Sequence, residues 1–189
     1  MMTTTNSLTL NLQTGLLEPV LYQPSPHCDE RPLGTEIDMI VIHGISLPPG
    51  QFGTDSVSAF FCGELDYASH PYFAEIKGLR VSSHLFIKRT GEIIQFVPFG
   101  KRAWHAGQSF YDGKSSCNDF SIGIELEGTD ILPYEVVQYQ RLSQAIFLIR
   151  QAYPLVTENR IVGHADIAPG RKTDPGMAFD WAYLKGKLA

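Results

Sequence analysis

One short stretch limits the folds open to this chain of 189 residues more than any other. Residues 37–43 (IDMIVIH) are almost wholly apolar and rich in β-branched side chains. Such a run is typical of a strand that other layers cover on both faces, as in α/β proteins. The run ends in a histidine, so we expect His43 at the end of a buried strand.

Other patterns complete the α/β class. Residues 81–88 and 92–97 alternate in polarity around a Thr-Gly pair, which predicts a β-hairpin, and residues 120–126 predict another strand. Apolar residues at helical spacing predict a helix over residues 135–152. Strands that alternate with helices are typical of a parallel sheet, and a hairpin adds an antiparallel pair, so we expect a mixed sheet.

The chain is expected to form a single domain, because 189 residues can bury one core without disulfides. Residues 1–16 are predicted to be a loose N-terminal extension and residues 17–189 the domain itself. Within it, Thr54 or Asp55 is expected to cap a short helix that runs through Phe61.

Composition excludes several classes of partner. A net charge of −5 disfavours a nucleic-acid binder, and an anionic substrate would have to be met by local arginines. Three scattered cysteines are too few for a disulfide framework, which favours a reducing compartment. Residues 1–11 lack the features of a secretory signal, and no segment approaches the roughly 18–20 apolar residues of a membrane span. We therefore expect a cytoplasmic protein without a membrane partner.

Residues 163–176 (GHADIAPGRKTDPG) carry the clearest metal-binding pattern. Two prolines and three glycines predict a shaped loop and exclude a regular helix or strand. The loop holds His164 and Asp174, donors of the types that zinc accepts, and catalytic zinc usually takes a third protein ligand. His43 is the best candidate because ligands collect at the carboxyl ends of strands, although a strand-end histidine taken alone is more often structural.

Two further residues suit the hydrolysis of an acyl bond. Lys172 lies two residues before the predicted carboxylate ligand, so its ammonium group could stabilise an oxyanion beside the metal. In the predicted strand, Glu125 projects from the side opposite the apolar residues, together with Gly123, whose missing side chain would leave space for a substrate or a metal. Glu125 is favoured as the general base, and Glu127 on the same face is the alternative.

The remaining histidines and one thiol have simpler explanations. His84, within an alternating strand, and His70, before a proline, favour structural roles. His105, next to an aromatic residue and a small-residue turn, is open because such a segment can wall a cleft. Cys28 follows His27, but nothing in the pattern orients the pair as a nucleophile and its base.

With these residues placed, the chain resembles the zinc N-acetylmuramoyl-L-alanine amidase family over about residues 15–184. Each motif alone is weak, but together they are highly specific. The motifs that carry the resemblance are residues 25–32 (SPHCDERP), 41–53 (VIHGISLPPGQFG), 81–85 (VSSHL), 103–107 (AWHAG), 123–128 (GIELEG) and the 163–176 loop.

The resemblance implies an α/β domain with a mixed central β-sheet flanked by α-helices and a zinc cleft at the ends of the strands. It implies hydrolysis of the amide between N-acetylmuramic acid, or its 1,6-anhydro form, and L-alanine in muropeptides released during cell-wall recycling. The residues concerned are His43, His164 and Asp174 as ligands of one zinc per chain, Glu125 as the base and Lys172 as its electrostatic partner.

The same resemblance suggests substrate contacts. Arg80 and Arg171 would receive the carboxylates of the peptide stem, and Tyr72 and Trp104 would line the groove. Gly44 stands where cytoplasmic members carry an asparagine, so a polar contact to the substrate would be absent.

Three other functions compete with this interpretation. A non-catalytic peptidoglycan-recognition module shares the fold but has lost a zinc ligand, whereas all three ligands are present here. A lytic amidase that acts on intact wall should show an export signal, a wall-binding module or a basic surface, and none is visible in the sequence. A cysteine hydrolase would need no zinc, so a metal measurement separates it.

Overall fold

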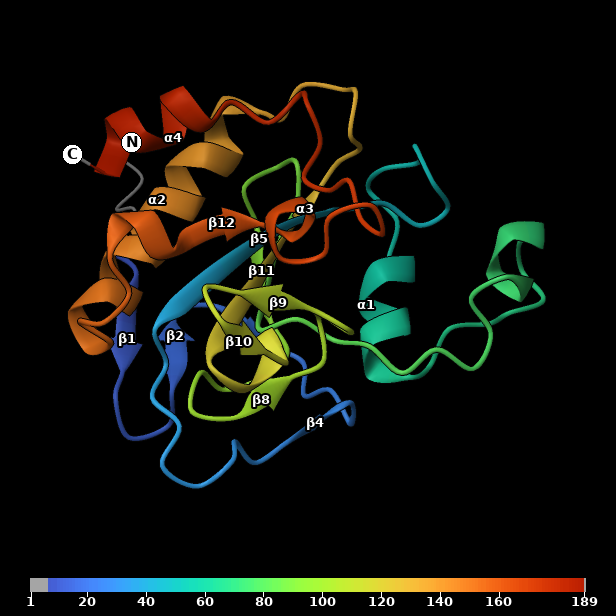
Figure 1. Cartoon of the computed structure of the whole chain (residues 1–189). Coiled ribbons are helices and arrows are strands. Elements are labelled where there is room, and N and C mark those ends of the chain that lie inside the picture. Colours follow the sequence, from blue (N-terminus) through green and yellow to red (C-terminus); the bar gives the residue numbers. More distant parts are fainter. Residues whose placement is uncertain (1–6, 189) are drawn as a thin grey trace.

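A six-stranded mixed sheet forms the centre of the computed structural model, which describes residues 7–188 (Figure 1). The first four strands across it are parallel, β7 is antiparallel to β6, and β3 is parallel to β7. The order across the sheet is β12 (Ile161–Gly163), β5 (Met39–Ile45), β11 (Ser121–Glu127), β6 (Leu85–Ile87), β7 (Ile93–Gln95) and β3 (Leu21–Tyr22). The predicted α/β class with a mixed sheet is confirmed.

The apolar run at residues 37–43 forms a central strand, as predicted, but it does not end at the histidine. The parallel register continues for two residues beyond His43, up to the pairing of Ile45 with Glu127. His43 therefore lies inside the ladder, where it is 1% exposed. The strand at 120–126 and the hairpin around Thr90 and Gly91 are also confirmed.

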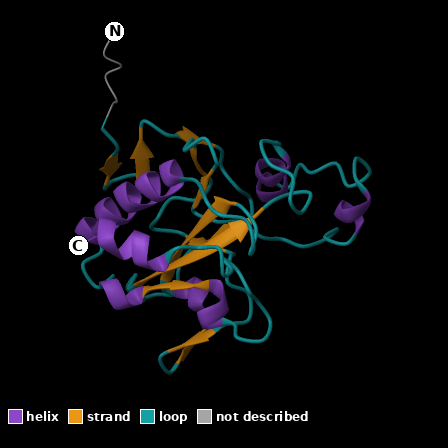
Figure 2. Cartoon of the chain, turned by 90° about the horizontal axis from the view of Figure 1, so that it is seen from above, coloured by secondary structure: helices purple, strands orange, loops and turns teal. Residues whose placement is uncertain are grey.

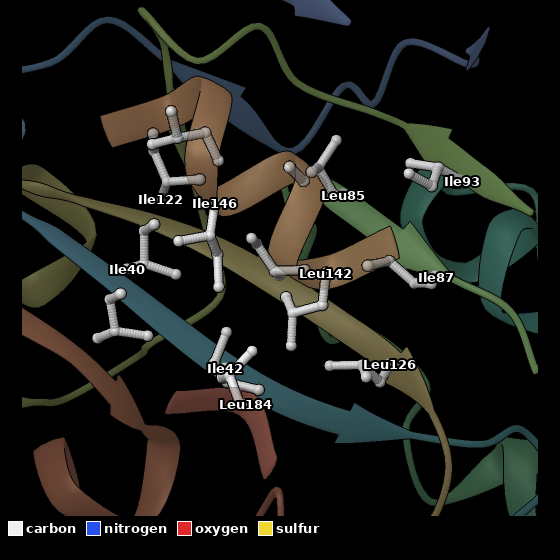
Figure 3. Close-up of a cluster of buried hydrophobic side chains, with 14 of the residues drawn as sticks. Ile40, Ile42, Leu85, Ile87, Ile93, Ile122, Leu126, Leu142, Ile146 and Leu184 are labelled. Carbon is white, nitrogen blue, oxygen red and sulfur yellow. The ribbon is translucent and has the colours of Figure 1, made fainter. Parts of the chain in front are cut away.

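Helices α2 (Val136–Ala152) and α4 (Trp181–Leu188) lie together on one face of the sheet (Figures 1 and 2). The helix predicted at 135–152 is thus confirmed. Beneath it, side chains from β5, β6 and β11 meet the apolar side of α2 in the main core (Figure 3). Residues Ile40, Ile42, Ile122 and Leu126 point to this face, so the alternate residues of β5 and β11 point to the other.

Helix α1 (Ser56–Cys62) stands at the side of the domain away from α2 and α4 (Figure 2). Asp55 occupies its cap position, but its side chain makes no capping hydrogen bond. The hydroxyl of Thr54 donates to the carbonyl of Leu47 and accepts from the amide of Ser56 at 3.4 Å, so of the two predicted caps only Thr54 takes up a free amide of this helix.

Short elements connect these layers. They are β1 (Thr9–Asn11), β2 (Leu16–Glu18), β4 (Cys28–Asp29), β8 (Arg102–Ala103), β9 (Phe110–Tyr111), β10 (Lys114–Ser115), α3 (His164–Ile167), and the 3-10 turns η1 (Pro71–Ala74), η2 (Cys117–Asp119) and η3 (Glu158–Arg160). Helix α3 corrects the prediction for residues 163–176, because one helical turn opens the loop before its first proline.

The N-terminal segment is more ordered than expected where it is described. Residues 1–6 of the predicted loose extension lie outside the described residues. From Thr9 onward the chain pairs with β2, and Leu8 and Leu10 pack against the main core. The boundary between residues 16 and 17 stays a prediction. Within residues 7–188, no helix has the length and apolar character needed to cross a membrane.

Candidate metal and active site

Three adjacent parallel strands bring polar side chains to one edge of the sheet. His43 of β5 is the register partner of Glu125 of β11, so both side chains lie on the face opposite α2. Strand β12 pairs with β5 and ends at Gly163, which places His164 immediately beyond that edge. The following loop folds back, because the amide of Ala165 donates to the carbonyl of Asp174 at 3.0 Å.

His43, His164 and Asp174 converge on one point. The two histidine Nδ1 atoms are 2.9 Å apart, and the Oδ2 atom of Asp174 lies 3.1 Å from Nδ1 of His43 and 3.0 Å from Nδ1 of His164. Around a tetrahedral zinc ion with zinc–ligand bonds of 2.0–2.1 Å, two donor atoms are separated by about 3.3 Å. The triangle is slightly tighter than that, and its donor set and spacing are compatible with a metal site.

The surroundings of His43 and Asp174 favour the protonation states that metal ligands need. Burial lowers the pKa of His43 to about 4, so the imidazole is neutral at physiological pH. Burial by itself raises the pKa of Asp174, but its close contacts with the imidazoles of His164 and His43 outweigh this effect and hold the pKa far below its usual value. Metal ligation requires a neutral imidazole and an ionised carboxylate.

Glu125 lies beside this cluster and is 8% exposed. Burial, followed by the negative charge of Asp174, raises the pKa of Glu125 well above its usual value, while the charge of Lys172 opposes the shift. Its Oε2 atom has no hydrogen-bond partner among the described residues. A buried oxygen without a partner is costly, so its presence at the cleft marks a group available for a bound molecule.

Glu127, the alternative base, is occupied by hydrogen bonds to the backbone. Its carboxylate accepts hydrogen bonds from the backbone amides of Gly53 and Arg89. Glu127 therefore holds the loop that follows β5, and it does not line the cleft.

The space beside Gly123 has a different occupant from the one expected. A Cβ atom at position 123 would lie 2.4 Å from Cγ of His105, so the histidine ring fills the room that the sequence suggested for a substrate or a metal. Burial lowers the pKa of His105 well below its usual value. Sequence reasoning left His105 open, and its only local signals were the aromatic residue before it and the small-residue turn after it.

A cleft of about 560 Å³ opens over the cluster. Several predicted residues line it together with the apolar side chains of α1. The predicted residues at the cleft are Gly44, Tyr72, Glu125, His164, Lys172 and Asp174.

Three predicted substrate residues lie outside this lining. Arg80 is exposed. Arg171 donates through Nη2 to the carbonyls of Ala106 and Gln108, at 2.7 and 2.6 Å. Trp104 donates through Nε1 to Asp29 at 3.2 Å.

Gly44 has a structural consequence that the sequence did not suggest. A Cβ atom there would lie 2.1 Å from the hydroxyl of Tyr134, which donates to the carbonyl of Pro175 at 2.9 Å. The missing side chain therefore lets a buried tyrosine reach the backbone next to Asp174. Sequence reasoning missed Tyr134, because nothing local links residue 134 to residue 44.

The thiol alternative finds no support in this geometry. Nδ1 of His27 lies 3.0 Å from the carbonyl of Val81, and the thiol of Cys28 donates to the carbonyl of Ser25. Burial raises the pKa of Cys28, which disfavours the thiolate that a nucleophile needs. His84 and His70 likewise contact backbone groups, those of Gly123 and Tyr72.

Comparison with known proteins identifies the class. The sequence profile of the N-acetylmuramoyl-L-alanine amidase family matches residues 33–177, and the chain belongs to this family. The 1,6-anhydro-N-acetylmuramyl-L-alanine amidase AmpD of Escherichia coli K12 is 55% identical over 174 residues, which cover 92% of this chain and 94% of that protein. The AmpD of Haemophilus influenzae is 52% identical and covers 90% of this chain and 93% of its own length.

Solved structures agree with this assignment. A crystal structure of a selenomethionine AmpD derivative superimposes with a TM-score of 0.92 at 51% identity, covering 95% of this chain and 99% of that one. AmiD of E. coli, solved with the substrate anhydro-N-acetylmuramic acid-L-Ala-D-γ-Glu-L-Lys, gives a TM-score of 0.59 at 31% identity, covering 84% of this chain and 60% of that one. The chain is thus an amidase by family.

Proposed function

We propose that this chain is a zinc amidase that cleaves the amide between 1,6-anhydro-N-acetylmuramic acid and L-alanine in peptidoglycan fragments during cell-wall recycling. Support comes from AmpD relatives that match more than nine-tenths of the chain at about 55% identity. It also comes from more distant relatives solved with anhydro-muropeptides. We place the enzyme in the cytoplasm, because three free thiols suit a reducing compartment.

The observation that carries the proposal is the triangle of His43, His164 and Asp174 beside an unpartnered buried carboxylate. These three residues would hold one zinc ion per chain. When bound, zinc supplies a Lewis acid that polarises a carbonyl oxygen.

Glu125 and Lys172 perform the remaining chemistry. Oε2 of Glu125 takes a proton from the water that attacks the lactyl carbonyl carbon, and the ammonium group of Lys172 stabilises the oxyanion that results. The C–N bond then breaks, and Glu125 returns the proton to the nitrogen of L-alanine. The products are the carboxylate of the sugar's lactyl group and a peptide with a free amino terminus.

Five residues are proposed to bind the substrate. Tyr72 and the backbone at Gly44 line the cleft directly. Arg80, Arg171 and Trp104 lie outside its lining, where they would meet the far end of a peptide stem.

The test is metal analysis of the purified chain combined with mass spectrometry of the products from an anhydro-muropeptide. We expect stoichiometric zinc, a free sugar and an intact L-alanyl peptide. An active enzyme without metal, or cleavage at a glycosidic bond, would overturn the proposal. Turnover on whole sacculi as fast as on soluble fragments would instead indicate a lytic amidase.

A further inference from the structure

The ring nitrogens of His43 and His164 that face away from the donor cluster contact two adjacent residues, His105 and Ala106. Nε2 of His43 lies 2.9 Å from Nδ1 of His105, and Nε2 of His164 lies 3.2 Å from the backbone carbonyl of Ala106. His43 lies in β5 and His164 is the first residue of α3, yet adjacent residues of one loop contact them. We refer to the segment formed by residues 105 and 106 as the bracket.

Hydrogen-bond chemistry fixes the proton on His164. A backbone carbonyl can only accept, so Nε2 of His164 must carry the hydrogen that it donates to Ala106. A neutral imidazole has one N–H group, and Nδ1 is then left with a free lone pair. That lone pair points at the cluster of donor atoms.

The proton on His43 is fixed through a longer chain of contacts. The hydroxyl of Ser121 donates to the carbonyl of Cys117, which can only accept. Its oxygen is then free to accept from Nε2 of His105, at 3.2 Å.

In this series of hydrogen bonds, the position of each hydrogen determines the direction of the next bond. With its hydrogen on Nε2, a neutral His105 presents an unprotonated Nδ1, which accepts from Nε2 of His43. His43 is therefore left with a lone pair on Nδ1, directed at Asp174 and His164.

Hydrogen bonds with neighbouring side chains hold the bracket in place. The side-chain oxygen of Asn118 accepts from the amides of both His105 and Ala106, at 3.0 and 2.8 Å. Arg171 donates to the carbonyl of Ala106 as well. Gly123 leaves the room in which the ring of His105 packs.

We infer that the bracket, with Asn118 and Ser121 behind it, is a positioning device that sets both histidines in the tautomer with Nδ1 free for the metal. The inference rests on the proposed function, because it assumes that these histidines bind zinc. Contacts that orient metal-binding histidines typically contribute about 10- to 100-fold to metal affinity. The nitrogen that binds the metal is thus decided by residues that do not touch it.

The first test compares His105→Leu with His105→Asn in the full-length chain. We expect the zinc dissociation constant, measured by competition with a chromophoric chelator, to rise about 10- to 100-fold in His105→Leu. His105→Asn should recover most of the affinity, because its amide oxygen can accept at the position of Nδ1. His84→Asn is the matched control, since His84 is an equally buried neighbour without a hydrogen bond to either ligand, and its zinc affinity should stay unchanged.

A spectroscopic readout separates this role from general stability. Nitrogen-15 NMR of the wild-type rings should show hydrogen on Nε2 of His43 and His164, and His43 should lose this single tautomer in His105→Leu. If that variant does not fold, Asn118→Ala and Asn118→Asp replace it. Asn118→Asp keeps an oxygen for both amides and should bind zinc like the wild type, whereas Asn118→Ala should bind it more weakly.

A folded His105→Leu with wild-type zinc affinity and an unchanged His43 tautomer would overturn the inference. So would equal affinities of Asn118→Ala and Asn118→Asp. A wild-type chain that binds no zinc would instead contradict the proposed function, so the two failures are distinguishable.

Discussion

At the scale of single residues, Glu125 and Glu127 show how neighbours decide what a carboxylate does. They lie on one face of β11 and are both buried. Glu127 accepts from two backbone amides, whereas Glu125 keeps one oxygen without a partner. The same residue type therefore serves as a structural anchor at one position and as a candidate base at the other.

Substitution of the two glutamates should separate these roles. Glu125→Gln keeps the shape of the side chain but cannot take a proton, so turnover should fall by about a hundred- to ten-thousand-fold while zinc content persists. The measurement is steady-state hydrolysis of an anhydro-muropeptide with metal analysis of the same sample.

Glu127→Gln is the companion variant for stability. Its NH₂ group would face at least one amide donor, so the free energy of unfolding in urea should drop by about 1–3 kcal/mol. An inactive Glu127→Gln that stays stable and metal-loaded, beside an active Glu125→Gln, would show that the base had been assigned to the wrong carboxylate.

Lys172 is expected to act on the transition state and not on the metal. It lines the cleft, and its charge opposes the raised pKa of Glu125. Lys172→Met should lower turnover by about a hundred- to a thousand-fold with a smaller change in substrate affinity. Zinc content decides the interpretation: if the variant loses its metal, the lysine supports the structure of the site instead.

At the scale of secondary-structure elements, one ion pair joins the short strands β4 and β8. Asp29 is the register partner of Arg102, and their side chains meet through two hydrogen bonds of 2.7 and 2.6 Å. The hydrogen bond from Arg102 lowers the pKa of Asp29, although burial opposes the shift. Arg102 also pairs with Asp119 of η2.

This pair makes stability depend on pH in a definite direction. The pKa of Asp29 is lower in the folded chain than its value of about 3.9 in the unfolded chain, so its contribution is complete above pH 4 and is lost as the pH falls through the folded pKa. Asp29→Asn should cost about 1 kcal/mol or less at pH 7, because the pair is partly exposed. The difference from wild type should shrink in urea unfolding at pH 3, and an unchanged difference there would contradict the assignment.

Within β11, Gly123 has a packing role that can be tested directly. Gly123→Ala would press a methyl group against the ring of His105, which should cost about 1–3 kcal/mol of unfolding free energy. Gly100→Ala is the control, because a Cβ atom there meets nothing within 4 Å. Equal melting temperatures for the two variants would show that the ring moves aside freely.

At the scale of the whole molecule, a bound metal should stabilise the entire fold. The three ligands join β5 to both ends of the loop that follows β12, and a ligand that binds only the folded state at a hundred times its dissociation constant adds about 2.7 kcal/mol. The melting temperature should therefore rise with free zinc and fall with a chelator. His164→Ala should show neither response, and a zinc-dependent rise in that variant would refute the ligand set.

Much of this architecture could be predicted from local patterns. Apolar periodicity predicted the buried run at 37–43, the hairpin at 81–97 and helix α2. It does so because side chains return to the same face every two residues in a strand and about every 3.6 residues in a helix, so the spacing of apolar residues shows which face is buried. The sequence was less informative where contacts distant in sequence decide the outcome. The N-terminal residues looked loose because their sequence does not reveal that Leu8 and Leu10 pack on the core.

The sequence by itself determined which residue types could hold a metal, because His43 and, in the 163–176 loop, His164 and Asp174 offer the nitrogen and oxygen donors that zinc accepts. Only the tertiary structure decided which nitrogen of each histidine is free, which glutamate is unpartnered, and what fills the space beside Gly123 and Gly44. His105 is 62 residues from His43, and Tyr134 is 41 residues from Pro175. A hydrogen bond has a direction and a length, so such assignments exist only once the folded chain has placed both partners within about 3 Å of each other.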